Sequence, residues 1–204
     1  MRDQRSGTLT PTRERLLEAA KALFAERGYE ATSTMAICRL AGTSESQLIK
    51  HFGSKRGILQ AIFEYAWEQI NPAVRLATES ISLPPEKLRV TIEMVLNFLA
   101  KDKQLSTLFL LEARRVREDG QLIALVPGFL QFVELIDGIL DQIAAQGKLS
   151  PEIHPQAFRS ALMGAIEGML RDQMLGQTSH FPAAYNEVDV RTICSFFLAA
   201  CIRS

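Results

Sequence analysis

The chain has 204 residues, of which 47% are hydrophobic, and its 23 basic side chains balance its 23 acidic ones. That composition supplies a core for one large or two small domains and excludes a disordered chain or a general polycation. Residues 1–60 carry ten Lys/Arg against six Asp/Glu, and residues 61–204 carry thirteen against seventeen. The first segment therefore has a net charge of +4 and the second a net charge of −4. This asymmetry suits a nucleic-acid-binding head on a neutral-to-acidic body, although a charge of +4 also fits an ordinary solvated surface.

No metal, cofactor or membrane partner is expected. Three cysteines without CxxC spacing indicate neither a disulfide framework nor a zinc site, and the three histidines lack ligand spacing. The N-terminus lacks the apolar segment of a signal peptide, and no apolar run approaches the ~18 residues needed to cross a bilayer. We therefore expect a cytoplasmic protein.

The first predicted helix begins at Pro11 and ends at Gly28. Thr10 is expected to cap it, and proline suits the first turn because the amide that it lacks would have no acceptor there. Apolar residues recur along one face at helical spacing. They are Leu16, Ala20, Leu23 and Phe24. This helix is expected to brace the segment that follows.

The next stretch has the pattern of a short helix followed by a tight turn. Ser33 offers a capping oxygen, and Ile37, Leu40 and Ala41 recur at the spacing of one buried face. Gly42 is expected to end the helix, because glycine adopts the left-handed conformation without steric cost.

A second short helix is expected from Ser44, which would form a capping box with Gln47. Leu48 and Phe52, four residues apart, would point inward. The remaining side chains form a mixed polar outer face, as a helix-turn-helix presents to base edges in the major groove. They are Glu45, Ser46, Gln47, Ile49, Lys50 and His51. The alternative is a solvated face on an ordinary helical hairpin.

Ser54 is expected to cap a fourth helix with Lys55 in its first turn. A cation there opposes the helix dipole, and a DNA phosphate held by Lys55 and the free amides would explain it. The pair Asn71-Pro72 is expected to break or kink this helix.

The rest of the chain shows no strand signature, so we expect an all-α fold. A helix should open at Pro84-Pro85, and others should cover residues 105–119 and 129–146. A penultimate helix and a terminal helix over about residues 188–202 would follow. Because the terminal helix is apolar nearly all round, it must be covered.

The order of residues over 12–63 resembles the N-terminal domain of the tetracycline-repressor (TetR/AcrR) family of transcriptional regulators. The matching residues are Phe24, Gly28-Tyr29, Thr32, Ile37, Ala41-Gly42, Leu48, His51-Phe52, Lys55 and Leu59. Two residues depart from the family pattern: Ile49 replaces the usual aromatic, and Ala36 replaces the usual acidic residue of the second helix. A weaker resemblance covers residues 147–175.

The resemblance implies a helix-turn-helix DNA-binding domain over residues 1–54 and a helical effector-binding and dimerisation domain over residues 55–204. A homodimer would bind a palindromic, double-stranded DNA operator, act as a repressor, and be released by a small-molecule effector. Base reading is expected from Glu45, Ser46, Gln47 and Lys50. Positioning on the DNA backbone is expected from Thr32, Ser33, Thr43, Ser44, Ile49, His51 and Lys55.

The effector is expected to be mainly apolar, because the central helices are rich in aromatic and methionine side chains. Each of these residues is also a plausible member of an ordinary core. Candidate pocket residues are Phe63, Trp67, Met94, Phe98, Phe109, Glu112, Phe132, Met163 and Glu167.

A dimer interface is expected on the last two helices, where Gly164 and Gly168 would let a partner backbone approach closely; tight packing within one subunit is the alternative. Candidate interface residues are Leu162, Gly164, Ile166, Gly168, Val190, Ile193, Phe197 and Cys201.

Two other classes compete with a regulator. An enzyme is not expected, since the chain has no nucleophile elbow, P-loop, dinucleotide fingerprint or Glu-x-x-His pair. A degenerate relative that binds a ligand or partner without recognising DNA stays open because of Ile49.

Overall fold

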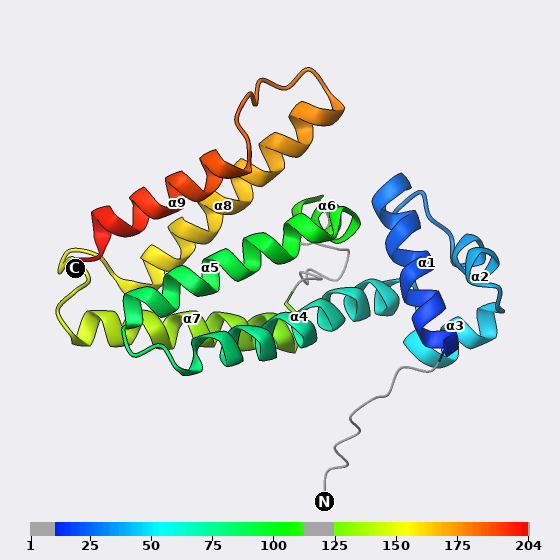
Figure 1. The fold of residues 1–204 in the computed structure, drawn as a ribbon. Coiled ribbons are helices and arrows are strands. Elements are labelled where there is room, and N and C mark those ends of the chain that lie inside the picture. Colours follow the sequence, from blue (N-terminus) through cyan, green and yellow to red (C-terminus); the bar gives the residue numbers. More distant parts are fainter. Residues whose placement is uncertain (1–10, 112–124, 204) are drawn as a thin grey trace, which may run out of the picture.

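The structure, a computed structural model, describes residues 11–111 and 125–203 (Figure 1). Within those ranges it contains nine α-helices and no β-strand, which confirms the all-α fold class. Three helices form a head: α1 (Pro11–Arg27), α2 (Thr34–Ala41) and α3 (Glu45–Phe52). The body consists of α4 (Lys55–Glu79), α5 (Pro84–Lys101), α6 (Lys103–Leu111), α7 (Pro127–Ala145), α8 (Pro155–Thr178) and α9 (Glu187–Cys201).

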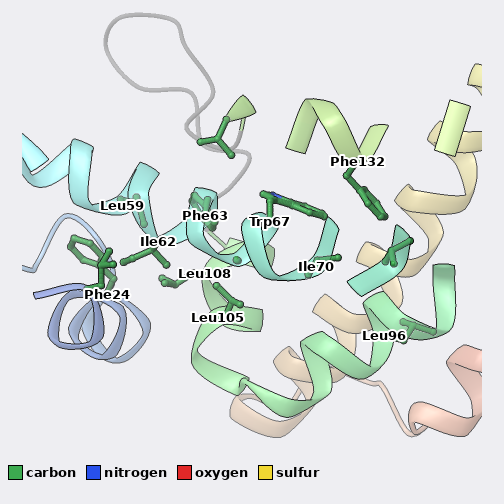
Figure 2. Packing of buried hydrophobic residues seen from close by; sticks show 14 of the residues in the cluster. Phe24, Leu59, Ile62, Phe63, Trp67, Ile70, Leu96, Leu105, Leu108 and Phe132 are labelled. Carbon is green, nitrogen blue, oxygen red and sulfur yellow. The ribbon is translucent and has the colours of Figure 1, made fainter. Parts of the chain in front are cut away.

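Helix α4 joins the head to the body. Figure 1 shows it leaving the head beside α1 and running along the body next to α7. Its apolar stripe is buried along its whole length, from Ile58 through Phe63 and Ile70 to Val74. In Figure 2, Phe24 of the head lies beside Ile62 of α4, and the buried residues of head and body form one cluster. The two parts therefore share a continuous apolar core.

Of the two expectations for Asn71-Pro72, a break or a kink, the break is wrong, because α4 continues through Pro72 to Glu79. Because proline has no amide hydrogen, the carbonyl of Glu68 receives no hydrogen bond from Pro72 four residues later. Both residues lie on the exposed side of the helix, where water can bond to this carbonyl. Asn71 is buried instead, and its Nδ2 donates to the carbonyl of Gly128 at 2.9 Å.

The first residues of α7 are clamped onto α4. The amide of Gly128 donates to both carboxylate oxygens of Glu64, at 3.2 and 3.0 Å, while its carbonyl accepts from Asn71. A Cβ at Gly128 would lie 2.6 Å from Cβ of Trp67, so only glycine allows this approach. The pair Pro127-Gly128 thus begins a helix that docks on α4.

Two predicted features lie outside the described residues: the cap Thr10 and the end of the sixth helix, with Glu112 and Gly120. The predicted helix starts at Pro11 and Pro84 are confirmed. Prolines also open α7 and α8, and Asn186 forms a capping box with Asp189 at the start of α9.

Helices α8 and α9 lie side by side along one edge of the body (Figure 1). Arg159 of α8 forms an ion pair with Asp137 of α7, and Arg191 of α9 forms one with Glu93 of α5. Because both pairs cross between helices, they fix the position of this edge. Among the described residues, no helix is both long and apolar enough to cross a membrane.

Candidate nucleic-acid interface and ligand cavities

The turn between α2 and α3 has the predicted geometry. Ser33 Oγ accepts from the amide of Ala36 at 3.1 Å, which confirms the cap of α2. Gly42 is left-handed, with φ 62° and ψ 44°. The amide of Thr43 then bonds to the carbonyl of Cys38 at 3.0 Å. These bonds close α2 and set the angle at which α3 leaves it.

The expected capping box at the start of α3 is wrong. The hydroxyl of Ser44 lies 2.8 Å from the hydroxyl of Ser46 and makes no cap bond to the α3 backbone. Another contact joins the two helices, because the hydroxyl of Thr34 on α2 donates to the carboxylate of Glu45 on α3. The short exposed helix α3 is therefore held by side-chain bonds at its N-terminal end.

The outer face of α3 is accessible as predicted. Glu45, Ser46, Ile49 and Lys50 are exposed, and Gln47 and His51 are partly exposed. Leu48 is fully buried. Phe52 packs against the core, and the guanidinium of Arg13 lies 5.3 Å from its ring centroid.

Helix α2 differs from the prediction at Leu40, which is 59% exposed although it was expected on the buried face with Ile37 and Ala41. Cys38 occupies the inner stripe in its place. Met35, 58% exposed, adds a second apolar side chain to the outer surface of α2. The helix is only eight residues long, so its buried stripe is narrow and has room for Cys38 or Leu40 but not for both.

Thr32 and Lys55 hold the loop between α1 and α2. The Thr32 side chain is buried, and its Oγ1 donates to the carbonyls of Leu23 and Gly28, so it does not face a phosphate. The ammonium of Lys55 donates to the carbonyls of Tyr29 and Thr32, both at 3.0 Å, and lies 4.3 Å from the centroid of the Tyr29 ring. These partners stabilise the cation at the start of α4 without a phosphate.

Gly57, at the junction of α3 and α4, is a structural residue that the sequence analysis missed. Ser54 Oγ accepts from its amide at 3.0 Å, which confirms Ser54 as the cap of α4. A Cβ at Gly57 would overlap the backbone oxygen of Phe52, the last residue of α3. The absent side chain thus lets α3 end directly against the first turn of α4 and sets where α3 projects.

A salt bridge ties the head to the body. Lys21 Nζ on α1 lies 2.9 Å from Asp102 and 3.0 Å from Glu18. Asp102 also caps α6, because its Oδ1 accepts from the amide of Leu105 at 2.9 Å. Burial favours the neutral form of Lys21, but the bonds from Asp102 and Glu18 outweigh it and raise the Lys21 pKa above 10.5.

The pKa of Asp102 is also shifted, in the opposite direction. Burial would raise it, but the bond from the Leu105 amide and the bond from Lys21 outweigh burial and hold the pKa below 3.8. The stabilisation from Asp102 is therefore complete above pH 3.8 and is lost as the pH falls through the lower folded-state pKa. The stabilisation from Lys21 is complete below pH 10.5 and is lost as the pH rises through its folded-state pKa.

We predict that Asp102→Asn lowers the free energy of unfolding at neutral pH by about 0.5–1 kcal/mol, since asparagine still caps a helix but carries no charge. Urea unfolding should show this difference shrinking as the pH falls below 3.8. Glu18→Gln, which removes an exposed contact to the same lysine, is the control and should cost about 0.2–0.5 kcal/mol. A difference that persists in acid would show that the loss is not electrostatic.

The predicted effector residues divide into a packed cluster and scattered positions. Trp67 lies at the centre of the cluster, with ring centroids 4.8 Å from Phe132, 5.4 Å from Phe129 and 5.6 Å from Phe109. Phe63 packs on Phe109 at 5.0 Å (Figure 2). The remaining described candidates, Met94, Phe98, Met163 and Glu167, are partly buried.

Two cavities lie elsewhere in the described part of the chain. One, of about 240 Å³, opens between α5, α6, α8 and α9 and includes none of the candidates. Its apolar wall contains Leu96, Leu99, Leu110, Leu170 and Val190, with Lys103 and Arg191 as its cations. The other, of about 230 Å³, lies between α1, α4, α5 and α6 and includes Phe98 alone of the candidates. Sequence periodicity identified buried aromatic residues but not the gaps between helices.

The outer face of α8 and α9 corrects part of the interface prediction. Leu162 and Val190 are buried within the chain, so they face away from any partner. Gly164 and Ile193 are exposed, and the other candidates, Ile166, Gly168, Phe197 and Cys201, are partly buried. Phe196, which is 69% exposed, was not among the candidates. A Cβ at Gly164 would meet no atom within 4 Å, so this face is open.

The described residues offer no metal-binding cluster. No group of three or more His, Cys, Asp or Glu side chains is placed to hold a metal in this part of the chain. The cysteines Cys38 and Cys194 are buried, and burial raises the pKa of each thiol. Both therefore remain protonated core residues near neutral pH.

Comparison with known families accounts for most of the chain. Residues 16–62 match the bacterial regulatory proteins of the tetR family. Residues 63–182, more than half of the chain, match the C-terminal region of YsiA-like proteins.

Individual relatives match most of the chain at low sequence identity. The HTH-type transcriptional regulator UidR of Escherichia coli K12 is 24% identical over 84% of this chain and 86% of its own length. The fatty acid metabolism regulator protein of Bacillus subtilis is 23% identical over 77% of this chain and 80% of its own length.

Solved structures have the same fold. The fatty acid degradation regulator FadR of Bacillus halodurans superposes with a TM-score of 0.82 at 19% identity, covering 95% of this chain and 97% of that one. FadR of Bacillus subtilis, solved in complex with stearoyl-CoA, superposes with a TM-score of 0.80 at 19% identity, covering 91% of this chain and 97% of that one.

Proposed function

Since the chain belongs to the TetR family of bacterial transcriptional regulators, we propose that it acts as a homodimeric repressor, released from a palindromic operator by an amphipathic effector. The observation that supports DNA binding most directly is the exposed face of α3, held at a fixed angle by the left-handed turn at Gly42. An accessible polar helix in that position enters a major groove.

The contacts of α3 refine the roles of its residues. Glu45 is partly committed to Thr34, so Ser46, Gln47 and Lys50 are the side chains most available to bases. Gln47 pairs by its chemistry with adenine, and Lys50 with guanine. Ile49, 53% exposed beside them, suits a thymine methyl group.

Phosphate contacts are assigned to exposed groups at the edges of α2, α3 and α4. Ser33, Thr43, Ser44 and His51 are all at least partly exposed and remain positioning candidates. Lys55 contributes to DNA binding indirectly, because its ammonium holds the loop before α2 in place. Thr32 acts in the same indirect way from inside the head.

The homodimer is supported by the apolar outer face of α8 and α9. Ile193 and Phe196 are exposed on α9, and the surface at Gly164 on α8 is open. Covering this face with the same face of a second copy would form a two-fold four-helix bundle. The two α3 helices would then reach successive major grooves about 34–36 Å apart.

A long-chain acyl-CoA is the first effector to test, since the similar Bacillus subtilis FadR was solved with stearoyl-CoA. The cavity between α5, α6, α8 and α9 combines leucine walls with Lys103, whose ammonium has no ion-pair partner among the described residues. Arg191 already pairs with Glu93, so Lys103 is the cation left for an anionic group. At about 240 Å³ the cavity holds only part of such a molecule, and side chains must move for the rest.

The test is selection of bound duplexes from random DNA, followed by binding assays at increasing salt. A working regulator recovers a palindrome bound by a dimer, and its affinity falls steeply with salt because each phosphate contact releases counterions. Stearoyl-CoA should then release the protein from that site, whereas acetyl-CoA, which lacks the long chain, should not. A folded dimer that enriches no site and shows no salt dependence would favour the degenerate relative.

We predict that Gln47→Ala relaxes the preference at one base pair of each half-site, with a loss of about 1–3 kcal/mol for the preferred base only. Binding to duplexes changed at that pair should be almost unaltered. Gln131→Ala, at an exposed position of α7, is the matched control and should bind like the wild-type protein. Equal losses for every sequence would remove Gln47 from the base-reading residues.

A further inference from the structure

Glu45 is an acidic residue on the surface that the head presents to DNA. It is the first residue of α3, and its side chain is exposed. A negative charge suits the first turn of a helix, because the free amides there carry the positive end of the helix dipole. On a surface that approaches phosphates, the same charge weakens binding to every DNA sequence. A carboxylate in this position therefore lowers affinity unless one particular base bonds to it.

Thr34 on α2 holds one oxygen of this carboxylate. It is the first residue of α2, and its hydroxyl donates to Oε1 of Glu45. Threonine is branched at Cβ and has few side-chain rotamers, so the bond restrains the longer and more flexible glutamate. The other oxygen, Oε2, has no hydrogen bond or ion pair within the described part of the chain. The carboxylate thus keeps one free acceptor oxygen on the exposed surface of the head.

We propose that Glu45 determines specificity for cytosine, and that Thr34 is its positioning residue. The free oxygen of Glu45 accepts a hydrogen bond from the amino group of one cytosine in each half-site. Thr34 contacts no base itself and acts by holding the carboxylate against α2. The inference rests on the proposed function, since it requires α3 to lie in a major groove.

The four bases differ in what they offer to a group that can only accept hydrogen bonds. In the major groove, guanine presents two acceptors, and thymine presents an acceptor and a methyl group. Adenine presents an amino group with the acceptor N7 beside it, and that acceptor repels a carboxylate. Cytosine presents an amino donor and no acceptor of its own. A carboxylate oxygen in a restrained position therefore favours cytosine.

Glu45→Gln separates base reading from support of the turn. Glutamine keeps an oxygen for the Thr34 hydroxyl, removes the charge and adds an amide that pairs with adenine. Discrimination in favour of cytosine should fall about tenfold at one base pair of each half-site, with the preference moving toward adenine. Affinity for unrelated DNA should rise about two- to fivefold, because the charge no longer repels phosphates. Equal losses for all sequences in the folded variant would overturn the assignment.

Thr34→Val tests the positioning role. Valine keeps the branched shape but cannot donate to Glu45. Discrimination at the same base pair should fall about threefold or more, while affinity for unrelated DNA stays within about twofold, since the charge of Glu45 remains. Wild-type discrimination in Thr34→Val would overturn the positioning role. Glu134→Gln removes an exposed charge on α7 and is the control for both variants, with every DNA affinity unchanged.

The experiment selects a site from random duplexes with the full-length wild-type protein. Fluorescence anisotropy then compares the four base pairs at each position of that site for the wild type and the three variants, and circular dichroism checks that each variant is folded. A selected half-site with no C·G pair would overturn the inference. If a site is found and Glu45→Gln discriminates as the wild type does at every position, the inference fails and the proposed function stands. If the wild type enriches no site, the proposed function fails and the inference fails with it.

Discussion

Gly57→Ala should weaken specific DNA binding by about tenfold or more. The new Cβ would overlap the backbone oxygen of Phe52, and its distance to the Phe52 carbonyl carbon would be 3.0 Å. Because both obstacles are backbone atoms, α3 and α4 must move apart. We expect a loss of about 1–3 kcal/mol in the free energy of unfolding and a drop of about tenfold or more in operator affinity.

Gly138→Ala is the matched control for this substitution. Gly138 also lies inside a helix, α7, but a Cβ there would meet no atom within 4 Å. Alanine should leave DNA affinity unchanged and raise stability by about 0.5–1 kcal/mol, since glycine is the poorer helix former. Fluorescence anisotropy with the selected duplex and urea unfolding measure the two effects. Wild-type affinity in Gly57→Ala would mean that the α3–α4 junction does not position the reading helix.

The sequence predicted the helices well because each has local signals. Prolines at helix starts, Gly42 in its left-handed turn and the serine caps Ser33 and Ser54 all act within one turn of the chain. The absence of a helix break at Asn71-Pro72 has a tertiary cause. The side chain of Asn71 bonds to Gly128, and the helix continues because packing against α7 outweighs the hydrogen bond that proline removes.

The candidate site was predictable where it depends on exposure along one helix. The outer face of α3 followed from the spacing of Leu48 and Phe52. The roles of Lys55 and Gly57 did not follow, because each depends on atoms that another element brings near: the carbonyls of Tyr29 and Thr32 in one case and that of Phe52 in the other. The cavities were missed for the same reason, since a gap between helices has no periodic signal.

Trp67→Ala should cause the largest loss of stability of any substitution considered. Trp67 is 5% exposed and its ring contacts those of Phe109, Phe129 and Phe132, from α6 and α7. Truncation of such a residue leaves a cavity and costs about 3–5 kcal/mol. Because the chain contains one tryptophan, its fluorescence reports on this cluster in the wild-type protein, and circular dichroism can follow unfolding of the variant.

Trp67→Phe separates the packing of the ring from its polar atom. The indole Nε1 is buried and has no hydrogen-bond partner among the described residues, and an unsatisfied buried donor costs about 1–3 kcal/mol. Phenylalanine removes that donor while it keeps a ring against Phe132. Removal of the unsatisfied donor therefore offsets much of the stability that the smaller contact area loses. We expect a net change within about 1.5 kcal/mol. A loss as large as that of Trp67→Ala would show that the indole N–H makes a stabilising bond, and the α4–α7 contact would then be polar as well as aromatic.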